Sequence, residues 1–401
     1  MDKTQKYFID TLNAFLTGAS PAAAEDIDID AFMRLAKIHS VAGIIGQTLA
    51  KAPLASEEAA SFFKKKALTT VMVSSAHIAI GNKVLAALDS AGIICVPFKG
   101  AIIRELYPVP ELRTFSDIDI LVPEDRFEDA HKVMISMGFE HTDGQKGVRG
   151  YNKDGFNFEI HHTLAGDMEE LTEGEQSFFA AAMNNIDLKR DGEHFLRLNK
   201  EYHLAYCLWH LAKHLSGSGA GVRMFMDIAL LLGDCEDCDT SKLSSHLKEL
   251  GIEKAAESIF ALCHAWFPSL ASDPKKELTP QAFDAMEQYV LSAGTFGFSA
   301  RTSGAARFRN EATTKSIFGA KAKIIFRMLF PSAEYLAKQY PWYSGSKILL
   351  PAVWIYRYFD VFLNRRKASS KALGEVLGGG QKEIEEARLL EELGWNIYSK
   401  K

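Results

Sequence analysis

Residues 93–162 have the pattern of alternating strands and helices inside a chain that is otherwise helical in pattern. Three runs have strand character: the apolar runs 93–97 (IICVP) and 117–122 (DIDILV), and the alternating run 155–162 (GFNFEIHH). Helical sequences separate them, at 101–107 and at 123–137. The order strand, helix, strand, helix, strand predicts a small α/β unit in this part of the chain.

The remaining sequence predicts helices on both sides of this unit. Apolar residues recur at helical spacing in five stretches: 7–16, 31–49, 56–88, 202–215 and 222–232. At 401 residues the chain is longer than one compact core usually is. We therefore expect an α+β protein with a helical N-terminal cap (1–92), a central core (93–198) and a helical C-terminal region (199–401).

Composition excludes a disordered or fibrous chain, because 47% of the residues are hydrophobic and 24% are charged. The first residues lack the pattern of a signal peptide, and no uninterrupted apolar run reaches the roughly 20 residues that span a bilayer. We expect a cytoplasmic protein without a membrane span.

The five cysteines are scattered and odd in number, which favours reduced thiols. Cys235 and Cys238 have zinc-like spacing without a second pair, so a polar turn is the preferred interpretation.

Two aspartates on the second predicted strand carry the main functional signal. Asp117 and Asp119 are two residues apart, so both side chains lie on one face of the strand. Carboxylates crowded at the edge of a core repel each other, and a divalent cation such as Mg²⁺ or Mn²⁺ removes that repulsion. Glu159 completes a group of three if the third strand pairs beside the second. We predict that all three are catalytic residues and metal ligands; the alternative is a solvated strand end.

Residues around the aspartates are candidates for phosphate binding. Lys99 and Gly100 follow a strand and precede a helix, whose free N–H groups favour phosphate. Gly100 lets a phosphate approach the backbone, and Lys99 adds a positive charge. Arg113 and Ser116 lie just before the aspartates, and a guanidinium can bind phosphate with two hydrogen bonds. The alternative for Arg113 is an ion pair with Glu111 or Asp117.

These residues carry a resemblance to a known superfamily. FKGAIIRELYPVPELRTFSDIDILV, followed by a helix and FEIHHTL, resembles the nucleotidyltransferases, in particular a bacterial family of uncharacterised nucleotidyltransferases and, more distantly, abortive-infection toxins. The resemblance implies a small mixed sheet flanked by helices and magnesium held by Asp117, Asp119 and Glu159. It also implies transfer of a nucleoside monophosphate from a nucleoside triphosphate to an unknown acceptor, with release of pyrophosphate. Most of the superfamily has Gly-Ser where this chain has Lys99-Gly100.

Histidines recur on one predicted helix after the core. His210 and His214 are four residues apart on one face, and Arg223 and Asp227 have the same spacing on the next helix. We predict that His161, His210, His214 and Arg223 contact the nucleotide. Two alternatives remain for the helix: a polar seam in which His210 or His214 pairs with Asp227, and a zinc site.

The segment 301–371 is basic, with fourteen Lys or Arg residues against three acidic ones. Such a segment fits an anionic partner, so RNA is a candidate. It fits equally a segment packed against the acidic remainder of the chain, and its many aromatic residues favour packing. Two other functions therefore stay open: a toxin-type nucleotidyltransferase that acts on RNA or protein, and a non-catalytic nucleotide-binding protein.

Overall fold

The computed structural model describes most of the chain as two compact units. The described residues are 1–295, except 53, 55, 143, 145, 167, 169–170, 190–193 and 272–277, and then 322, 325–340, 342–364, 370 and 381–397. The first unit comprises Met1–Ala212 and Ala220–Phe296, and the second comprises Lys213–Gly219 and Gly297–Lys401. The three-part division of the chain at residues 92 and 198 stays a prediction.

The N-terminal part is helical, as predicted. Its helices are α1 (Lys3–Thr17), α2 (Ile29–Ile38), α3 (Ala42–Leu49) and α4 (Glu57–Ser90). The side chains of Asp2, Asp28 and Ser56 accept backbone N–H groups at the starts of α1, α2 and α4, which is the usual role of such residues before a helix. The stretch 31–49 forms two helices rather than one, because Ser40 between them has a positive φ of 55°.

The central sheet has five strands and is mixed, which confirms the predicted α+β fold. Its strands are β1 (Val96–Phe98), β2 (Asp117–Leu121), β3 (Glu140–Thr142), β4 (Val148–Lys153) and β5 (Phe156–His161). They lie in the order β1-β2-β5-β4-β3, and β2 pairs with β5 in parallel while the other pairs are antiparallel. The first strand lies later than the predicted 93–97. The predicted helix 101–107 is only α5 (Gly100–Ile103) followed by a 3₁₀ turn, η1 (Arg104–Leu106).

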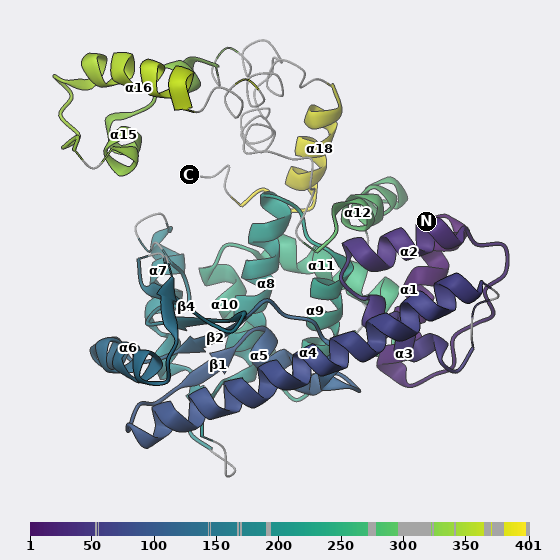
Figure 1. Cartoon of the computed structure of the whole chain (residues 1–401). Coiled ribbons are helices and arrows are strands. Elements are labelled where there is room, and N and C mark those ends of the chain that lie inside the picture. The colour runs from purple at the N-terminus through teal and green to yellow at the C-terminus, as the bar shows by residue number, and fades with distance from the viewer. Residues whose placement is uncertain are drawn as a thin grey trace. The chain divides into compact units, whose positions relative to one another are not determined.

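One face of the sheet packs on α4 and on α6 (Phe127–Ser136). Ile118 and Ile120 of β2 and Phe158 of β5 are buried there against Leu88 and Met134. Burial of each such side chain contributes roughly 1.5–3 kcal/mol to folding. Figure 1 shows α4 as a long helix that runs from α1–α3 past the sheet. Residues alternate along a strand, so the opposite face of β2 and β5 is left for Asp117, Asp119 and Glu159.

Helices follow the sheet, as predicted. In the first unit these are α7 (Glu173–Ala180), α8 (Lys200–Ser216, which runs on into the second unit), α9 (Val222–Asp234), α10 (Thr240–Glu249), α11 (Glu253–Trp266) and α12 (Pro280–Ala293), with a small sheet of β6 (Ile186–Asp187) and β7 (Arg197–Leu198) before α8. The second unit contains α15 (Ala333–Gln339), α16 (Leu350–Asn364) and α18 (Gln381–Glu392). Leu336, Tyr340, Tyr343 and Val353 form a small core within it. Residues 301–321 of the basic segment lie outside the described residues, so its packing against the rest of the chain stays a prediction.

Two features bear on the predictions about membranes and thiols. Among the described helices, α4 is long and apolar enough to cross a membrane by length and composition, and 33% of its most apolar window is buried. The absence of a membrane span therefore stays a prediction. The prediction of five reduced cysteines is wrong for one pair, because Cys235 and Cys238 form a disulfide in the turn after α9. That turn brings their Cα atoms to 4.9 Å, within the range that a disulfide bridges.

Candidate active site

The register of three strands brings the site together. Asp119 on β2 lies opposite Phe98 of the antiparallel β1 and opposite Glu159 of the parallel β5. Residues directly opposite each other on paired strands point to the same face of the sheet. The third predicted strand does pair beside the second, as the three-carboxylate hypothesis requires. His161, two residues after Glu159, also projects from that face.

A carboxylate cluster forms around Asp119, Glu159 and His161. Their ligand atoms all lie within 4.8 Å of one another. His161 Nε2 is 3.0 Å from Asp119 Oδ1 and 3.2 Å from Glu159 Oε2. Asp119 and His161 are buried, whereas the side chain of Glu159 is 40% exposed. The cluster therefore combines two buried side chains with one carboxylate that is exposed to solvent.

Asp117 lies at the start of β2, on the same face but outside that group of three. It is half-buried, and its Oδ1 accepts a 2.9 Å hydrogen bond from the Ser116 hydroxyl. Burial raises the pKa of Asp117, and the nearby charge of Asp119 raises it further. Ser116 therefore contacts the first aspartate, and its predicted contact with phosphate stays a prediction.

Lys99 supplies the positive charge that balances the cluster. Its Nζ is 2.7 Å from Asp119 Oδ1. Burial alone would raise the pKa of Asp119, but the Lys99 ammonium and the hydrogen bond from His161 hold that pKa well below its usual range. Burial would likewise lower the pKa of Lys99, and the charge of Asp119 outweighs it and raises that pKa. The pair is ionised, and it provides a cation beside the carboxylates.

The backbone at Lys99 is strained. Its φ of 50° with ψ of −131° is a conformation that residues other than glycine rarely adopt. Such residues cost of order 1–3 kcal/mol each and cluster at functional sites. The Lys99 N–H donates to His203 Nε2 of α8 at 3.2 Å, which helps to hold the turn. The sequence predicts that Lys99 lies near the aspartates, but it does not predict the contact with His203, which lies 104 residues further along the chain.

Gly100 is needed for packing as well as for any phosphate contact. A Cβ at this position would lie 2.1 Å from Arg113 Nη1, so the guanidinium occupies the space of a side chain. The helix that follows, α5, has only four residues. The predicted helix N-terminus for phosphate is therefore a short turn. Contact between Gly100 and a phosphate stays a prediction.

Arg113 is bound by a partner that the sequence analysis did not identify. Its Nε is 3.1 Å from Asp227 Oδ1 and its Nη2 is 2.7 Å from Asp227 Oδ2, and all of these groups are buried. The Tyr107 hydroxyl donates to the same carboxylate at 2.7 Å. Asp227 therefore takes the place of the alternative partners considered for Arg113 (Glu111 or Asp117), and Arg113 that of His210 or His214 for Asp227. Contact between Arg113 and a phosphate stays a prediction. One edge of the guanidinium, Nε and Nη2, is therefore bound to Asp227, and Nη1 donates to the carbonyl of Thr114. These bonds tie the loop before Asp117 to α9.

The remaining candidates lie on α8 and α9. Arg223 is half-buried and donates from Nη1 to the carbonyl and to the hydroxyl of Thr114, the latter at 3.0 Å. Burial lowers the pKa of Arg223 to about 10, and its Nε has no hydrogen-bond partner among the described residues. The ring of His210 stacks on Tyr206, with centroids 6.0 Å apart. His214 belongs to the segment that groups with the second unit. Nucleotide contacts by these residues stay predictions.

Comparison with known proteins gives one family match over more than half of the chain. A family model described as an uncharacterised nucleotidyltransferase matches residues 25–268. Among solved structures, the chain is similar to the antibiotic-resistance factor ANT(2'')-Ia in solution, with 13% sequence identity and a TM-score of 0.34. That likeness covers 46% of this chain and 95% of the other. No match was found among curated proteins. The family match spans the whole sheet and includes every residue of the carboxylate cluster.

Proposed function

Because the chain belongs to the family of uncharacterised nucleotidyltransferases, we propose that it transfers a nucleoside monophosphate from a nucleoside triphosphate to an acceptor. An acceptor hydroxyl or phosphate oxygen forms a bond to the α-phosphorus. The bond from that phosphorus to the β-phosphate oxygen breaks, and pyrophosphate leaves. The observation that carries the proposal is the carboxylate cluster, in which Asp119, Glu159 and His161 offer ligand atoms within 4.8 Å of one another.

The cluster fits a divalent cation. Its carboxylate oxygens are the ligands that Mg²⁺ and Mn²⁺ prefer, and both carboxylates converge on His161 Nε2, at 3.0 Å from Asp119 and 3.2 Å from Glu159. Asp119 and Glu159 would hold the ion, with Asp117 beside them on the same face. A bound ion would neutralise charge on the phosphates and favour the deprotonated form of the attacking hydroxyl. Glu159, which is partly exposed, accepts the proton of that hydroxyl if it is free to act as a base.

Lys99 has a second partner in this scheme. Its ammonium now rests on Asp119, at the centre of the cluster. If Asp119 holds a divalent cation, the Lys99 ammonium is free to pair with the triphosphate, which is the other concentrated negative charge at the site. The hydrogen bond between the Lys99 backbone and His203 keeps the turn in place while the side chain moves.

Replacing Lys99 with Ala is expected to weaken binding of ATP about tenfold or more while adenosine binding changes little. The ammonium acts on phosphate oxygens and has no partner on the nucleoside, and a charge-assisted hydrogen bond is worth about 1.5–3 kcal/mol. Calorimetric titration with both ligands measures the difference. Lys132→Ala, an exposed lysine of α6, is the matched control. Equal losses for ATP and adenosine would show a folding defect instead of a phosphate contact.

Metal binding is tested by replacing both aspartates of β2. Calorimetry with Mn²⁺ and a non-hydrolysable triphosphate should show binding to the natural protein that Asp117→Asn with Asp119→Asn abolishes. Asp154→Asn is the control, because Asp154 lies in the exposed turn between β4 and β5 at a positive φ of 52°, which Asn tolerates. Unchanged metal binding in the double variant would remove the basis of the proposal.

The acceptor and the rival functions are separated by one assay. Each α-labelled triphosphate is incubated with Mg²⁺ and, in turn, small molecules, RNA and protein, and the label is followed. Label on RNA or protein would favour the toxin-type enzyme, and triphosphate binding without any transfer would favour a non-catalytic nucleotide-binding protein. We infer transfer to be the function because the cluster keeps a reachable acid, Glu159, beside a buried, charge-balanced one. Location in the cytoplasm stays part of the proposal.

A further inference from the structure

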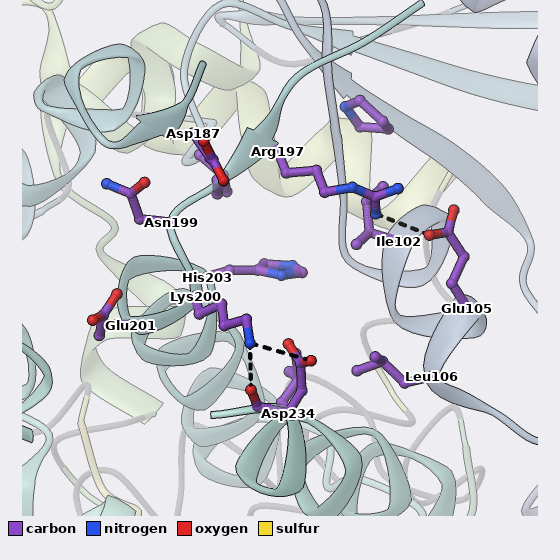
Figure 2. Close-up of a pocket in the computed structure, with 13 residues that line it drawn as sticks. Ile102, Glu105, Leu106, Asp187, Arg197, Asn199, Lys200, Glu201, His203 and Asp234 are labelled. Atoms are coloured by element: carbon purple, nitrogen blue, oxygen red, sulfur yellow. Dashed lines mark hydrogen bonds and ion pairs between the residues drawn. The ribbon is translucent and has the colours of Figure 1, made fainter. Parts of the chain in front are cut away.

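A second candidate site lies beside β1, apart from the carboxylate cluster. A pocket of about 420 Å³ is formed by β1, α5 and η1, the two strands of the small sheet, the start of α8 and the end of α9. Among its lining residues are Glu105, Asp187, Arg197, Asn199, Glu201 and His203 (Figure 2). None of the lining residues belongs to the carboxylate cluster. Pockets of roughly 300–1,000 Å³ are the usual size for small-molecule sites.

His203 places an unused hydrogen-bond donor in this pocket. The residue is 6% exposed, and Figure 2 shows its ring projecting between the residues that line the pocket. Burial lowers the pKa of His203 to about 4, so the ring is neutral near pH 7. Its Nε2 accepts the N–H of Lys99, and the ring proton therefore sits on Nδ1. Among the described residues Nδ1 has no hydrogen-bond partner, so it is available to donate to a ligand or to water.

The two cations of the pocket are already paired. Arg197 Nη1 is 2.9 Å from Glu105 Oε2. Lys200 Nζ donates to the backbone oxygen of Asp234 at 2.7 Å and lies 3.2 Å from Asp237 Oδ1. Figure 2 shows the contacts of Arg197 with Glu105 and of Lys200 with Asp234 as dashed lines. These cations are therefore not available to attract an anionic ligand.

Two carboxylates of the pocket form no ion pair among the described residues, although Arg197, which pairs with Glu105, lies opposite Asp187 in the small sheet. Asp187 accepts only the backbone N–H of Lys189, at 3.1 Å, and Glu201 accepts only that of Asp239, at 2.9 Å, among the residues that the structure describes. The unmatched charge of the pocket is negative. A ligand that matches the pocket would therefore bring a positive charge for these carboxylates and an oxygen that accepts a hydrogen bond from His203 Nδ1.

We propose that this pocket binds a small organic cation that also carries hydroxyl or carbonyl oxygens. Its ammonium groups pair with Asp187 and Glu201, and its oxygen accepts hydrogen bonds from His203 Nδ1 and the side-chain amide of Asn199. The site is distinct from the proposed nucleotide site and does not depend on that proposal. Because His203 also binds the Lys99 backbone, the occupant contacts a residue that positions the catalytic turn.

The probe is 1,3-diamino-2-propanol, compared with glycerol, which has the same carbon skeleton and no charge. Both are titrated into the full chain by calorimetry, at low ionic strength, at pH 7 and without nucleotide. The diamine is expected to bind and glycerol is not. Asp187→Asn with Glu201→Gln should weaken diamine binding about tenfold or more, since it removes both unpaired carboxylates. Asp125→Asn with Glu236→Gln removes the same charge from exposed positions outside the pocket and should leave binding unchanged.

A second variant separates the site from a general charge effect. His203→Gln keeps an acceptor oxygen for the Lys99 N–H and loses the ring Nδ1–H, so diamine affinity should fall about threefold or more while the protein stays folded by circular dichroism. No diamine binding, equal binding of glycerol, or unchanged affinity in both pocket variants would overturn the proposal. None of these outcomes bears on nucleotide transfer, because the assay contains no triphosphate.

Discussion

Replacing Glu159 with Gln is expected to lower the rate of nucleotide transfer by about 100-fold or more. The residue is the reachable carboxylate of the cluster, 3.2 Å from His161 Nε2, and the substitution removes its charge while keeping its shape. Loss of one group that acts on developing charge in an active site typically costs about 10²–10³ in rate. The free energy of unfolding should change by less than about 1 kcal/mol, because the side chain is partly exposed. The measurement is single-turnover transfer from an α-labelled triphosphate once the acceptor is known.

The matched control for this variant is Glu140→Gln, an exposed glutamate on β3 of the same sheet. It should transfer nucleotide at the natural rate. If Glu159→Gln remains as active as this control, the carboxylate takes no part in the reaction. If it loses activity together with several kcal/mol of stability, the effect is on folding.

Replacing Asp227 with Ala is expected to lower the free energy of unfolding by about 3–5 kcal/mol, the usual cost of removing one partner of a buried ion pair. Asp227 receives two hydrogen bonds from Arg113 and one from Tyr107, and all three side chains are buried. The substitution leaves the Arg113 guanidinium charged and without its carboxylate. Urea denaturation followed by tryptophan fluorescence measures the loss.

Asp234→Ala is the comparison for this variant, since Asp234 lies at the end of the same helix and is only half-buried. Its ion pair with Lys200 is exposed enough that the loss should be within about 1 kcal/mol. Similar stabilities for the two variants would show that the network of Arg113, Tyr107 and Asp227 contributes little to holding the fold.

The parts of the fold that local patterns determine were predictable from the sequence. The alternation of FNFEIH and the apolar DIDIL run place β5 and β2, because side chains on a strand alternate between a buried and an open face. The same rule places Asp119 and Glu159 on one face of the sheet once the two strands pair, and the pairing itself was an assumption. Helical periodicity likewise located α1, α4, α8 and α9.

Contacts between distant segments were not predictable in this way. The polar β3 (EHT) is fully exposed and lacks the apolar signal of a strand, so it was missed. The partner of Arg113 lies 114 residues away on α9, and no spacing rule connects the two. Lys99 was singled out as a phosphate residue, yet its pairing with Asp119 depends on how β1 aligns with β2. Such pairings depend on tertiary packing, which one sequence does not encode as a local pattern.

The parallel pairing of β2 with β5 limits how the chain can change in length. Asp119 faces Glu159 only in the present register. A single residue inserted before Glu159 within β5 would turn Glu159 to the opposite, apolar face and bring a neighbour into the site. A substitution in β5 therefore changes one side chain, whereas an insertion or deletion there moves every following side chain of the strand to the other face of the sheet. Relatives of this chain that retain the cluster should vary in length in the loops, such as the one before β4, and keep the interval from the start of β5 to Glu159 constant.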